Sequence, residues 1–570
     1  MELSDLLKTL LDKRGISDVE SFLNPDYSSL HDPMLLPDMG KALTRFFAAM
    51  ERNERIAIYT DFDCDGVSGA TVFSDFLEKI GYQNAEIYMP HRDMEGYGFH
   101  EQAIRELCAR GTTLIITVDV GIAAAAQVCV ANELGINVII TDHHEVMNEI
   151  PAAFAIVNPK LSGPALSGVE GYPFPHLCGA AVAYKFVQAA LKEGRARGIE
   201  AFLKIPEGWE KWLLDVVAIA TIADMVPLIG ENRILVHFGL RVLRRTRRPG
   251  LAALAQATRL RLTEITEDDI GFSIAPRINA ASRMDNPDLA LKLLTTQDAH
   301  EATQLAAQLE ALNAKRKSTV ATIVRSAKKR ARERFAEDSP VTVLGDTAWK
   351  PALLGLAANS LMGDRGGVVC LWGRDVAGNL KGSCRSDGSV SLSDLFKNAP
   401  DAFLQFGGHA HAGGFTVSSE QVHTLHEALM QAHEKVAAEK MVRELADLIH
   451  DATLSLSTIS DGLIREISLL SPFGIGNPKP VFLISDARIG NVRQFGKEKN
   501  HIEVMLECER TGRIVRAFDF FKQPTAFTLP LARGASANVL ATLERDTFRA
   551  PTAIALRIVD VFPTSGTVVS

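Results

Sequence analysis

The segment 55–160 alternates short apolar runs with amphipathic stretches, and this pattern constrains the fold more than any other feature of the chain. The runs RIAIYT, NAEIYMP, TTLIITVD and GINVIITD are typical of strands, and GATVFSDFLEKIG and AAAAQVCVANELG between them are typical of helices. Strand–helix alternation at this spacing predicts a mostly parallel α/β sheet.

Acidic residues and histidines follow these expected strands. The groups are Asp61, Asp63 and Asp65 after the first strand, Asp119 after the third, and Asp142, His143 and His144 after the fourth. Asp224 follows a further apolar run, IATIADMVPL. Because reactive groups in such sheets gather at the carboxyl ends of the strands, we expect one site there.

The alternating aspartates raise an electrostatic problem. Two carboxylates roughly 4 Å apart repel by about 4 kcal/mol at an effective dielectric constant of about 20. Each group alone has an ordinary explanation: Asp65-Gly66 resembles a helix N-cap, and His143-His144 resembles a pair of surface or core histidines. Together the clusters predict a binuclear metal centre, since cations neutralise the repulsion, activate a water and hold a phosphoryl group.

The rest of the chain divides by composition. An Ala-rich helical region covers about 174–300, and 298–335 lacks Gly and Pro, which predicts one long connecting helix. A second α/β pattern starts with PVTVLGD at 340 and includes KGSCRSDGS and FGGHAHAGGF. Beyond about 450, ARIGNVRQF, HIEVMLECE, RIVRAFDFF, ASANVLATLE and TAIALRIVDVF predict a small β-barrel or sandwich.

Length, charge and cysteine content further narrow the classes of protein to which this chain could belong. A length of 570 residues suggests three or four domains, and the net charge of −8 does not by itself indicate a nucleic-acid ligand. Two basic clusters, 241–250 and 315–334, are ordinary as solvated helix faces unless other residues imply a polyanion. The seven cysteines contain no C-x-x-C pair, which indicates neither a zinc site nor a disulfide framework. With no signal peptide or apolar span, we expect a cytoplasmic protein outside the membrane.

The motifs DFDCDG, TVDVG, TDHH and ADMVPL are similar, in order and spacing, to the four motifs of the DHH phosphoesterase family. Further segments resemble its branch of bacterial single-strand-specific exonucleases. They are MPHRDMEGYGF, HLCGAAVAYK, PLIGENRILV, PRINAASRM, ALNAKRK, FGGHAHAGGF and PFGIGNPKPVF. The likeness covers about residue 7 to residue 562, and the ordered series is far more specific than any one motif.

The resemblance implies the roles of individual residues. The expected metal ligands are Asp63, Asp65, Asp119, His143, His144 and Asp224, for one or two Mn²⁺ or Mg²⁺ ions, with His144 also in the catalytic group. Asp61 and Asp142 would lie beside the metals and orient ligands or water. The expected substrate-binding residues are Arg92, Arg277, Asn279, Arg283, Arg385 and His409, because arginine binds phosphate bidentately. For Arg283 a surface salt bridge is an equally good explanation.

The resemblance also implies the domains. These are a lead-in (1–50), a DHH catalytic domain (51–297), a connector helix (298–335), a DHHA1-like substrate-binding domain (336–450) and an OB-fold barrel (451–570). In the barrel, Arg493, Phe495, Lys497 and Lys499 lie near one expected loop. Three departures concern the grip on the substrate: Lys350 replaces a histidine, AANSL lacks an arginine, and Ser282 replaces a glycine.

The implied activity is metal-dependent 5′→3′ hydrolysis of single-stranded DNA to 5′-mononucleotides, in DNA repair and recombination. A monomer acting with a single-strand-binding protein and a helicase is implied as well. Two alternatives stay open: a phosphodiesterase of short oligoribonucleotides or cyclic dinucleotides, which needs only the two α/β domains, and an inactive DNA-binding scaffold. The barrel disfavours the first, and the intact Asp and His positions disfavour the second.

Overall fold

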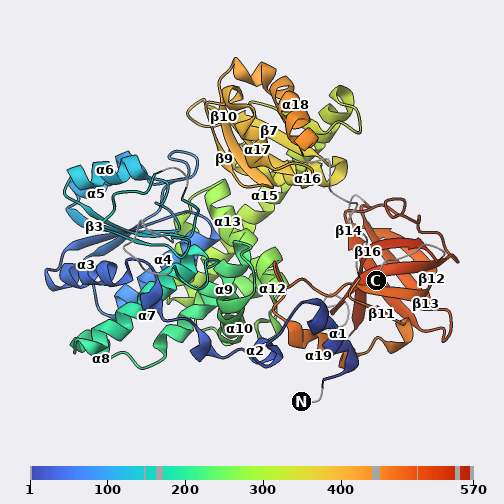
Figure 1. Cartoon of the computed structure of the whole chain (residues 1–570), viewed down its shortest axis with the longest axis horizontal. Helices are drawn as coiled ribbons and strands as arrows, with labels where there is room; N and C mark the ends of the chain where they lie inside the picture. Colours follow the sequence, from blue (N-terminus) through green and yellow to red (C-terminus); the bar gives the residue numbers. More distant parts are fainter. Residues whose placement is uncertain are drawn as a thin grey trace. The chain divides into compact units, whose positions relative to one another are not determined.

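The computed structural model describes residues 3–146, 149–161, 171–439, 450–496, 499–545 and 553–564 (Figure 1). The chain forms two compact units. The larger unit comprises His31–Val226 and Phe238–Arg443, and the smaller comprises Met1–Leu30, Pro227–His237 and Glu444–Ser570. Among the described helices, none has the length and apolar character that crossing a membrane requires.

The first sheet of the larger unit is parallel throughout, as the strand–helix alternation predicts. Its strands are β1 (Arg55–Thr60), β2 (Ala85–Tyr88), β3 (Thr112–Val118), β4 (Asn137–Thr141) and β5 (Ala155–Val157), in the order β2-β1-β3-β4-β5. The short strand β5 was not predicted. Because β1, β3 and β4 are adjacent and parallel, the residues that follow them meet at one edge.

Helices cover both faces of this sheet. On one face lie α5 (Glu101–Ala109) and α6 (Ala125–Glu133), and on the other lie α3 (Met39–Glu51), α4 (Cys64–Lys79) and α7 (Gly179–Ala196) (Figure 1). Burial on both faces explains why the strands are nearly continuous apolar runs. Gly69 allows α4 and α7 to approach closely, since a Cβ there would lie 2.4 Å from Cγ1 of Val118 and 3.3 Å from Cα of Ala180.

A helical layer follows. It contains α8 (Glu200–Leu203), α9 (Leu214–Ala223), α10 (Gly230–Leu243), α11 (Pro249–Thr258), α12 (Glu267–Asp269), α13 (Ala275–Met284), α14 (Asp288–Thr295) and α15 (Ala299–Arg334). Of α10, only the part from Phe238 onward belongs to the larger unit. The helix α15 is continuous over 36 residues, as the lack of Gly and Pro predicts, and the Asp298 carboxylate caps its first turn by accepting from Glu301 N.

The second sheet is mixed. Its strands are β6 (Val341–Gly345), β7 (Val368–Arg374), β8 (Leu380–Ser386), β9 (Gln405–Gly408) and β10 (Ala412–Val417), in the order β6-β7-β8-β10-β9, with only β6 and β7 parallel. The associated helices are α16 (Pro351–Arg365), α17 (Leu392–Lys397) and α18 (Gln421–Glu439). This sheet is the expected second α/β region.

One cysteine pair departs from the sequence analysis. Cys370 on β7 lies directly opposite Cys384 on β8, and the two form a disulfide. The sequence contains no local signal for this pair, because the antiparallel register rather than a short spacing brings the two residues together.

The smaller unit is built around a closed β-barrel, which matches the prediction. Its strands are β11 (Ala452–Leu454), β12 (Phe482–Phe495), β13 (His501–Cys508), β14 (Ile514–Phe520), β15 (Ser536–Arg545) and β16 (Ile554–Pro563), and β12 also pairs with β15. With them lie α1 (Asp5–Lys13), α2 (Val19–Leu23) and α19 (Asp461–Ile467). Leu7, Leu10 and Leu11 of α1 join the barrel core, so this lead-in is part of the same hydrophobic cluster.

The barrel residues named from the sequence have mixed environments. Arg493 pairs with Glu503 at 3.1 Å, and the Phe495 ring lies 5.2 Å from that of His501. Lys499 follows in a left-handed turn. Lys497 lies outside the described residues.

Candidate metal centre

The three alternating aspartates do not continue the strand. β1 ends at Thr60 and α4 begins at Cys64, so the chain turns between them. The N-cap is Asp63 rather than Asp65: its Oδ1 accepts from the backbone N–H groups of Asp65 (2.8 Å) and Gly66 (3.2 Å). A Cβ at Gly66 would lie 2.3 Å from the Asp61 carbonyl oxygen, so only glycine fits this turn.

Asp65 is held by the N-terminus of α7. Its Oδ2 accepts from Gly179 N and its Oδ1 from Ala180 N, both at 2.7 Å. The free N–H groups and dipole of a helix start stabilise such a carboxylate. Gly179 also makes room for a second acid, because a Cβ there would lie 2.6 Å from Cβ of Asp119.

One further acid has a strained backbone, and another directly precedes a strained residue. Asp119, directly after β3, has φ +60°, and Met225, directly after Asp224, has φ +59°. A left-handed conformation in a non-glycine residue costs on the order of 1–3 kcal/mol and is concentrated at functional sites. Asp224 itself is the C-cap of α9, so a helix end and a strand end bring the two carboxylates to the same edge.

Asp142 is fully buried and organises the histidine pair. Its Oδ1 accepts from His143 N (2.7 Å), His144 N (3.1 Å) and His144 Nδ1 (2.8 Å), while Oδ2 accepts from Ile122 N (2.9 Å). Burial raises the pKa of Asp142, but the hydrogen bond and charge of His144 outweigh it and lower that pKa to about 2. An ionised Asp142 only accepts, so His144 donates from Nδ1.

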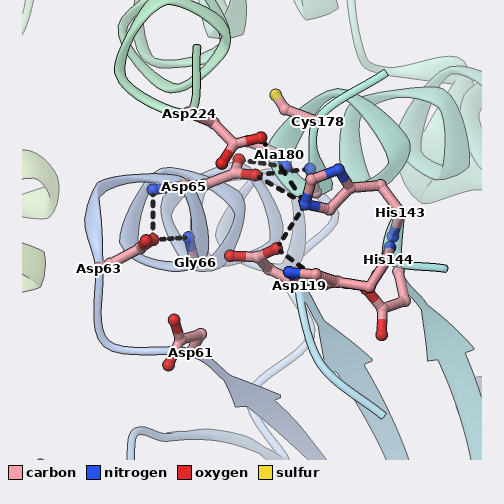
Figure 2. Close-up of polar contacts among 12 residues, drawn as sticks. Asp61, Asp63, Asp65, Gly66, Asp119, His143, His144, Cys178, Ala180 and Asp224 are labelled. Atoms are coloured by element: carbon pink, nitrogen blue, oxygen red, sulfur yellow. Dashed lines mark hydrogen bonds and ion pairs between the residues drawn. The ribbon is translucent and has the colours of Figure 1, made fainter. Parts of the chain in front are cut away.

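The remaining groups converge on His143. Its Nε2 lies 3.1 Å from Oδ1 of Asp119 and 3.7 Å from carboxylate oxygens of both Asp65 and Asp224 (Figure 2). Three overlapping triads have their ligand atoms within 4.8 Å of one another. They are Asp119–His143–His144, Asp65–His143–Asp224 and Asp61–Asp63–Asp119. The structure therefore brings together all eight acidic and imidazole residues expected at this edge.

The donor set fits divalent metal ions. Within the residues that the structure describes, His143 Nε2, Asp119 Oδ1 and Asp61 Oδ1 are buried and make no well-oriented hydrogen bond, although the first two atoms lie 3.1 Å apart. Leaving such atoms unpaired costs about 1–3 kcal/mol each, more for charged groups. Carboxylate oxygens suit Mg²⁺ or Mn²⁺, and the two imidazoles shift the preference toward Mn²⁺ or softer transition metals.

The pKa values show the cost of this crowding. Burial and the charge of Asp63 raise the pKa of Asp61 to about 8 and that of Asp65 to about 6. Burial and the charges of Asp65 and Asp63 raise the pKa of Asp224 to about 8 and that of Asp119 well above its usual range.

The two histidines differ in charge. Burial and the neighbouring His144 lower the pKa of His143 to about 3, so His143 is neutral. Burial opposes protonation of His144 too, but the hydrogen bond and charge of Asp142 outweigh it and raise its pKa to about 9.

An arginine cluster lies beside the acids. Burial and the nearby guanidinium groups of Arg92, Arg316 and Arg385 lower the pKa of Arg283 to about 9. Arg92 also lies 4.7 Å from the ring centre of Phe62, and the acids Asp61 and Asp63 act on it electrostatically. Segments far apart in the sequence thus bring several positive charges close together.

Other expected substrate residues have protein partners. Arg277 pairs with Glu310 and donates to Ser273 O, and Asn279 Oδ1 accepts from Cys64 N at 2.9 Å. Asn279 therefore supports the start of α4. His409 is exposed in the turn between β9 and β10, and Arg385 Nη1 donates to Cys384 O at 2.7 Å.

Two of the sequence departures have structural consequences. Lys350 is the N-cap of α16, and its Nζ lies 2.7 Å from Oδ2 of Asp93, next to Arg92. Ser282 is fully buried, and its Oγ lies 3.4 Å from Asn279 O.

Sequence reasoning missed three contributors: Gly179, Arg316 and Asp93. HLCGAAVAYK and ALNAKRK contain the first two, but their roles depend on contacts that only the fold creates. The basic tripeptide KRK, residues 315–317 of the long helix, was the sequence signal that could have pointed to Arg316 as a substrate-binding residue.

Family models match three parts of the chain: the DHH family N-terminal domain (55–221), the DHHA1 domain (338–437) and the RecJ OB domain (450–560). The chain is 36% identical over 514 residues to the single-stranded-DNA-specific exonuclease RecJ of Bacillus subtilis, covering 89% of this chain and 62% of that relative. The chain therefore spans less than two thirds of the length of that protein.

The RecJ exonuclease of Haemophilus influenzae is 30% identical over 523 residues, covering 90% of this chain and 89% of that protein. Among solved structures, RecJ of Thermus thermophilus in complex with Mn²⁺ is similar, with a TM-score of 0.77 and 27% identity. The match covers 98% of this chain and 76% of that one.

Proposed function

Because this chain belongs to the RecJ group of the DHH family, we propose that it is a metal-dependent exonuclease that hydrolyses single-stranded DNA in the 5′→3′ direction. The products would be 5′-mononucleotides, and the biological setting would be DNA repair and recombination. The observation that carries the proposal is the set of overlapping Asp and His triads, whose buried atoms lack well-oriented hydrogen bonds in the described part of the chain.

We assign the metal ligands from these triads. Asp65, His143 and Asp224 would hold one ion. Asp119, which the other two triads share, would hold a second ion with His144 from one triad and Asp63 from the other, beside Asp61. Bound Mn²⁺ or Mg²⁺ ions would supply a water activated for attack and charge stabilisation at the departing oxygen.

The protein's own side chains would prepare this chemistry. Asp142 fixes His144 with Nε2 as the remaining ligand nitrogen, because Nδ1 is already hydrogen-bonded. The αL conformation of Asp119 and the α7 N-terminus at Asp65 fix two carboxylates before a metal arrives. Such preorganisation reduces the reorganisation needed in the reaction.

The arginine cluster would bind the substrate phosphates. Arg92, Arg283 and Arg385 come from the two α/β regions of the larger unit, and Arg316 comes from α15. Tyr97, which is 56% exposed with its ring 6.2 Å from that of His144, offers a stacking surface for a base. The barrel would bind more of the strand. A monomer in the cytoplasm, acting with a single-strand-binding protein and a helicase, completes the proposal.

The test is digestion of end-labelled single-stranded DNA, duplex DNA and RNA with Mn²⁺, Mg²⁺ or EDTA. We expect mononucleotide release from the 5′ end of single-stranded DNA with metal only, and no cleavage by Asp63→Ala or Asp119→Ala variants that keep the parent's circular dichroism. Equal digestion of duplex and single strand would contradict the specificity. Strand binding without cleavage in either metal would instead indicate a scaffold.

A further inference from the structure

The arginine-rich segment RVLRRTRR, residues 241–248, has no part in the site described above. It begins in the last turn of α10 and runs to the start of α11, within the larger unit. Of its five arginines, Arg248 is internal and three line a hollow in the surface, while the exposed Arg247 lies over the Trp212 ring at 3.8 Å.

Arg248 belongs to the internal group. Its Nε lies 3.0 Å from Oδ2 of Asp215, and its Nη2 lies 2.6 Å from Oδ2 of Asp75. Two carboxylates thus neutralise one guanidinium, and its side chain is only 10% exposed. Arg248 is a structural residue that joins α4, α9 and α11.

The other group surrounds a hollow of about 410 Å³, lined by Arg241, Arg244, Arg245 and Thr263. Hollows of about 300–1,000 Å³ are typical of small-ligand sites. In the parts of the chain that the structure describes, no carboxylate lies within 4 Å of the guanidinium groups of Arg241, Arg244 and Arg245. Arg241 and Arg245 are exposed.

One of these guanidinium groups is fixed in place. Arg244 donates from Nε (3.2 Å) and Nη2 (2.9 Å) to the carbonyl oxygen of Ile265. A donor that is already oriented loses less conformational freedom when it binds an anion. Thr263 also lines the hollow, and its hydroxyl group is a further hydrogen-bonding group for an anion.

The hollow is separate from the metal centre. Arg248, next to the lining residues, contacts Asp215 in the first turn of α9, whereas Asp224 caps the other end of that helix. Nine residues of helix rise about 13 Å, so the two sites are at opposite ends of α9.

We propose that this hollow is a second anion site, which binds phosphate groups away from the reaction centre. Three guanidinium groups around one space repel one another, and a phosphate relieves that repulsion while accepting several of their hydrogen bonds. The phosphate could be part of a nucleic-acid strand, and that version of the inference rests on the proposed function. It could also be a free mononucleotide or inorganic phosphate, and that version does not depend on the proposed function.

The test compares the Arg241→Ala/Arg245→Ala variant with an Arg52→Ala/Arg105→Ala control. Both change the net charge equally, and the control arginines lie on exposed surfaces beside Glu54 and Glu101. Binding is measured in EDTA, which prevents cleavage, with a hexathymidylate, a thirty-nucleotide thymidylate, thymidine 5′-monophosphate and inorganic phosphate as probes. Circular dichroism melting confirms that both variants fold.

If the source is a strand, the Arg241/Arg245 variant binds the long thymidylate at least tenfold more weakly. The slope of log K against log salt then falls by about 1.4, since each phosphate contact on a single strand contributes about 0.7. If the source is a small phosphate, calorimetry shows one fewer site for the monophosphate or for inorganic phosphate. Either result supports the site.

Unchanged binding of all four probes, or an equal loss in the control, overturns the inference. The parent's cleavage of single-stranded DNA with Mn²⁺ is recorded separately. Absence of cleavage refutes the proposed function while leaving a monophosphate or phosphate result at the hollow intact.

Discussion

Nδ1 of His144 donates a hydrogen bond to Oδ1 of Asp142 at 2.8 Å, and this contact determines which imidazole nitrogen is available as a ligand. The same carboxylate also accepts from the backbone of His143 and His144, so one buried aspartate fixes the rings and the main chain of the histidine pair. Supporting acids of this kind commonly affect metal affinity by 10- to 100-fold.

Substitution Asp142→Asn therefore weakens Mn²⁺ binding by about 10- to 100-fold, measured by calorimetry. The pKa of His144 falls from about 9 toward its ordinary 6.5, which an NMR titration detects, because the neighbouring negative charge is lost. The exposed Asp401→Asn change serves as the control and leaves both quantities unchanged. An Asp142→Asn protein with parental Mn²⁺ affinity would refute the supporting role.

Gly179 is required by the approach of Asp119, so Gly179→Ala displaces that carboxylate. We expect loss of Mn²⁺ binding and cleavage, with a decrease of about 1–3 kcal/mol in the free energy of unfolding from overpacking. Gly363→Ala, in α16, is a matched control because nothing lies within 4 Å of its added Cβ. The control should be neutral or slightly stabilising. If the two variants had the same Mn²⁺ binding, cleavage and free energy of unfolding, position 179 would not require glycine.

The metal-free protein becomes less stable as the pH rises above 6.5. Asp61 and Asp224 have pKa values of about 8 in the folded state, and His144 has one of about 9, so the folded state binds more protons than the unfolded chain. The contribution of His144 to the free energy of unfolding is fully present below pH 6.5 and is lost as the pH rises through 9. Ionisation of Asp61 and Asp224 in the folded state lowers the free energy of unfolding progressively up to about pH 8.

Thermal melting in EDTA at pH 6.5, 7.5 and 8.5 tests this, and Mn²⁺ should raise the melting temperature most at pH 8.5, since metal must displace the protons. The Asp224→Asn variant should show a weaker pH dependence of the melting temperature in EDTA than the parent. A melting temperature that rises with pH in EDTA would contradict the raised pKa values of Asp61, Asp224 and His144.

Lys350 and Asp93 form a partly exposed ion pair that joins α16 to the loop carrying Arg92. Pairs of this kind contribute up to about 1 kcal/mol, which is about fivefold in affinity. Lys350→Met or Asp93→Asn should each weaken binding of a single strand in EDTA by about two- to fivefold, and the double variant should lose no more than either single. Additive losses would mean that the two residues act independently.

Much of the architecture follows from local sequence. Apolar runs of strand length, the Gly- and Pro-free stretch 298–335 and the closely spaced β runs after 480 specify the two sheets, α15 and the barrel through local preferences. The edge at which Asp119 and His143 meet also follows, because parallel neighbouring strands end together.

Long-range contacts decided the rest. The sequence places Asp61, Asp63 and Asp65 at every second position, but only the turn into α4 makes Asp63 a cap and lets Asp65 reach the α7 N-terminus, 114 residues away. The Cys370–Cys384 pair and the arginine cluster around Arg283 likewise depend on register and on packing between distant segments. Local sequence determines which elements form and which residues end them, whereas charge compensation and close approach depend on tertiary packing, because both act through space.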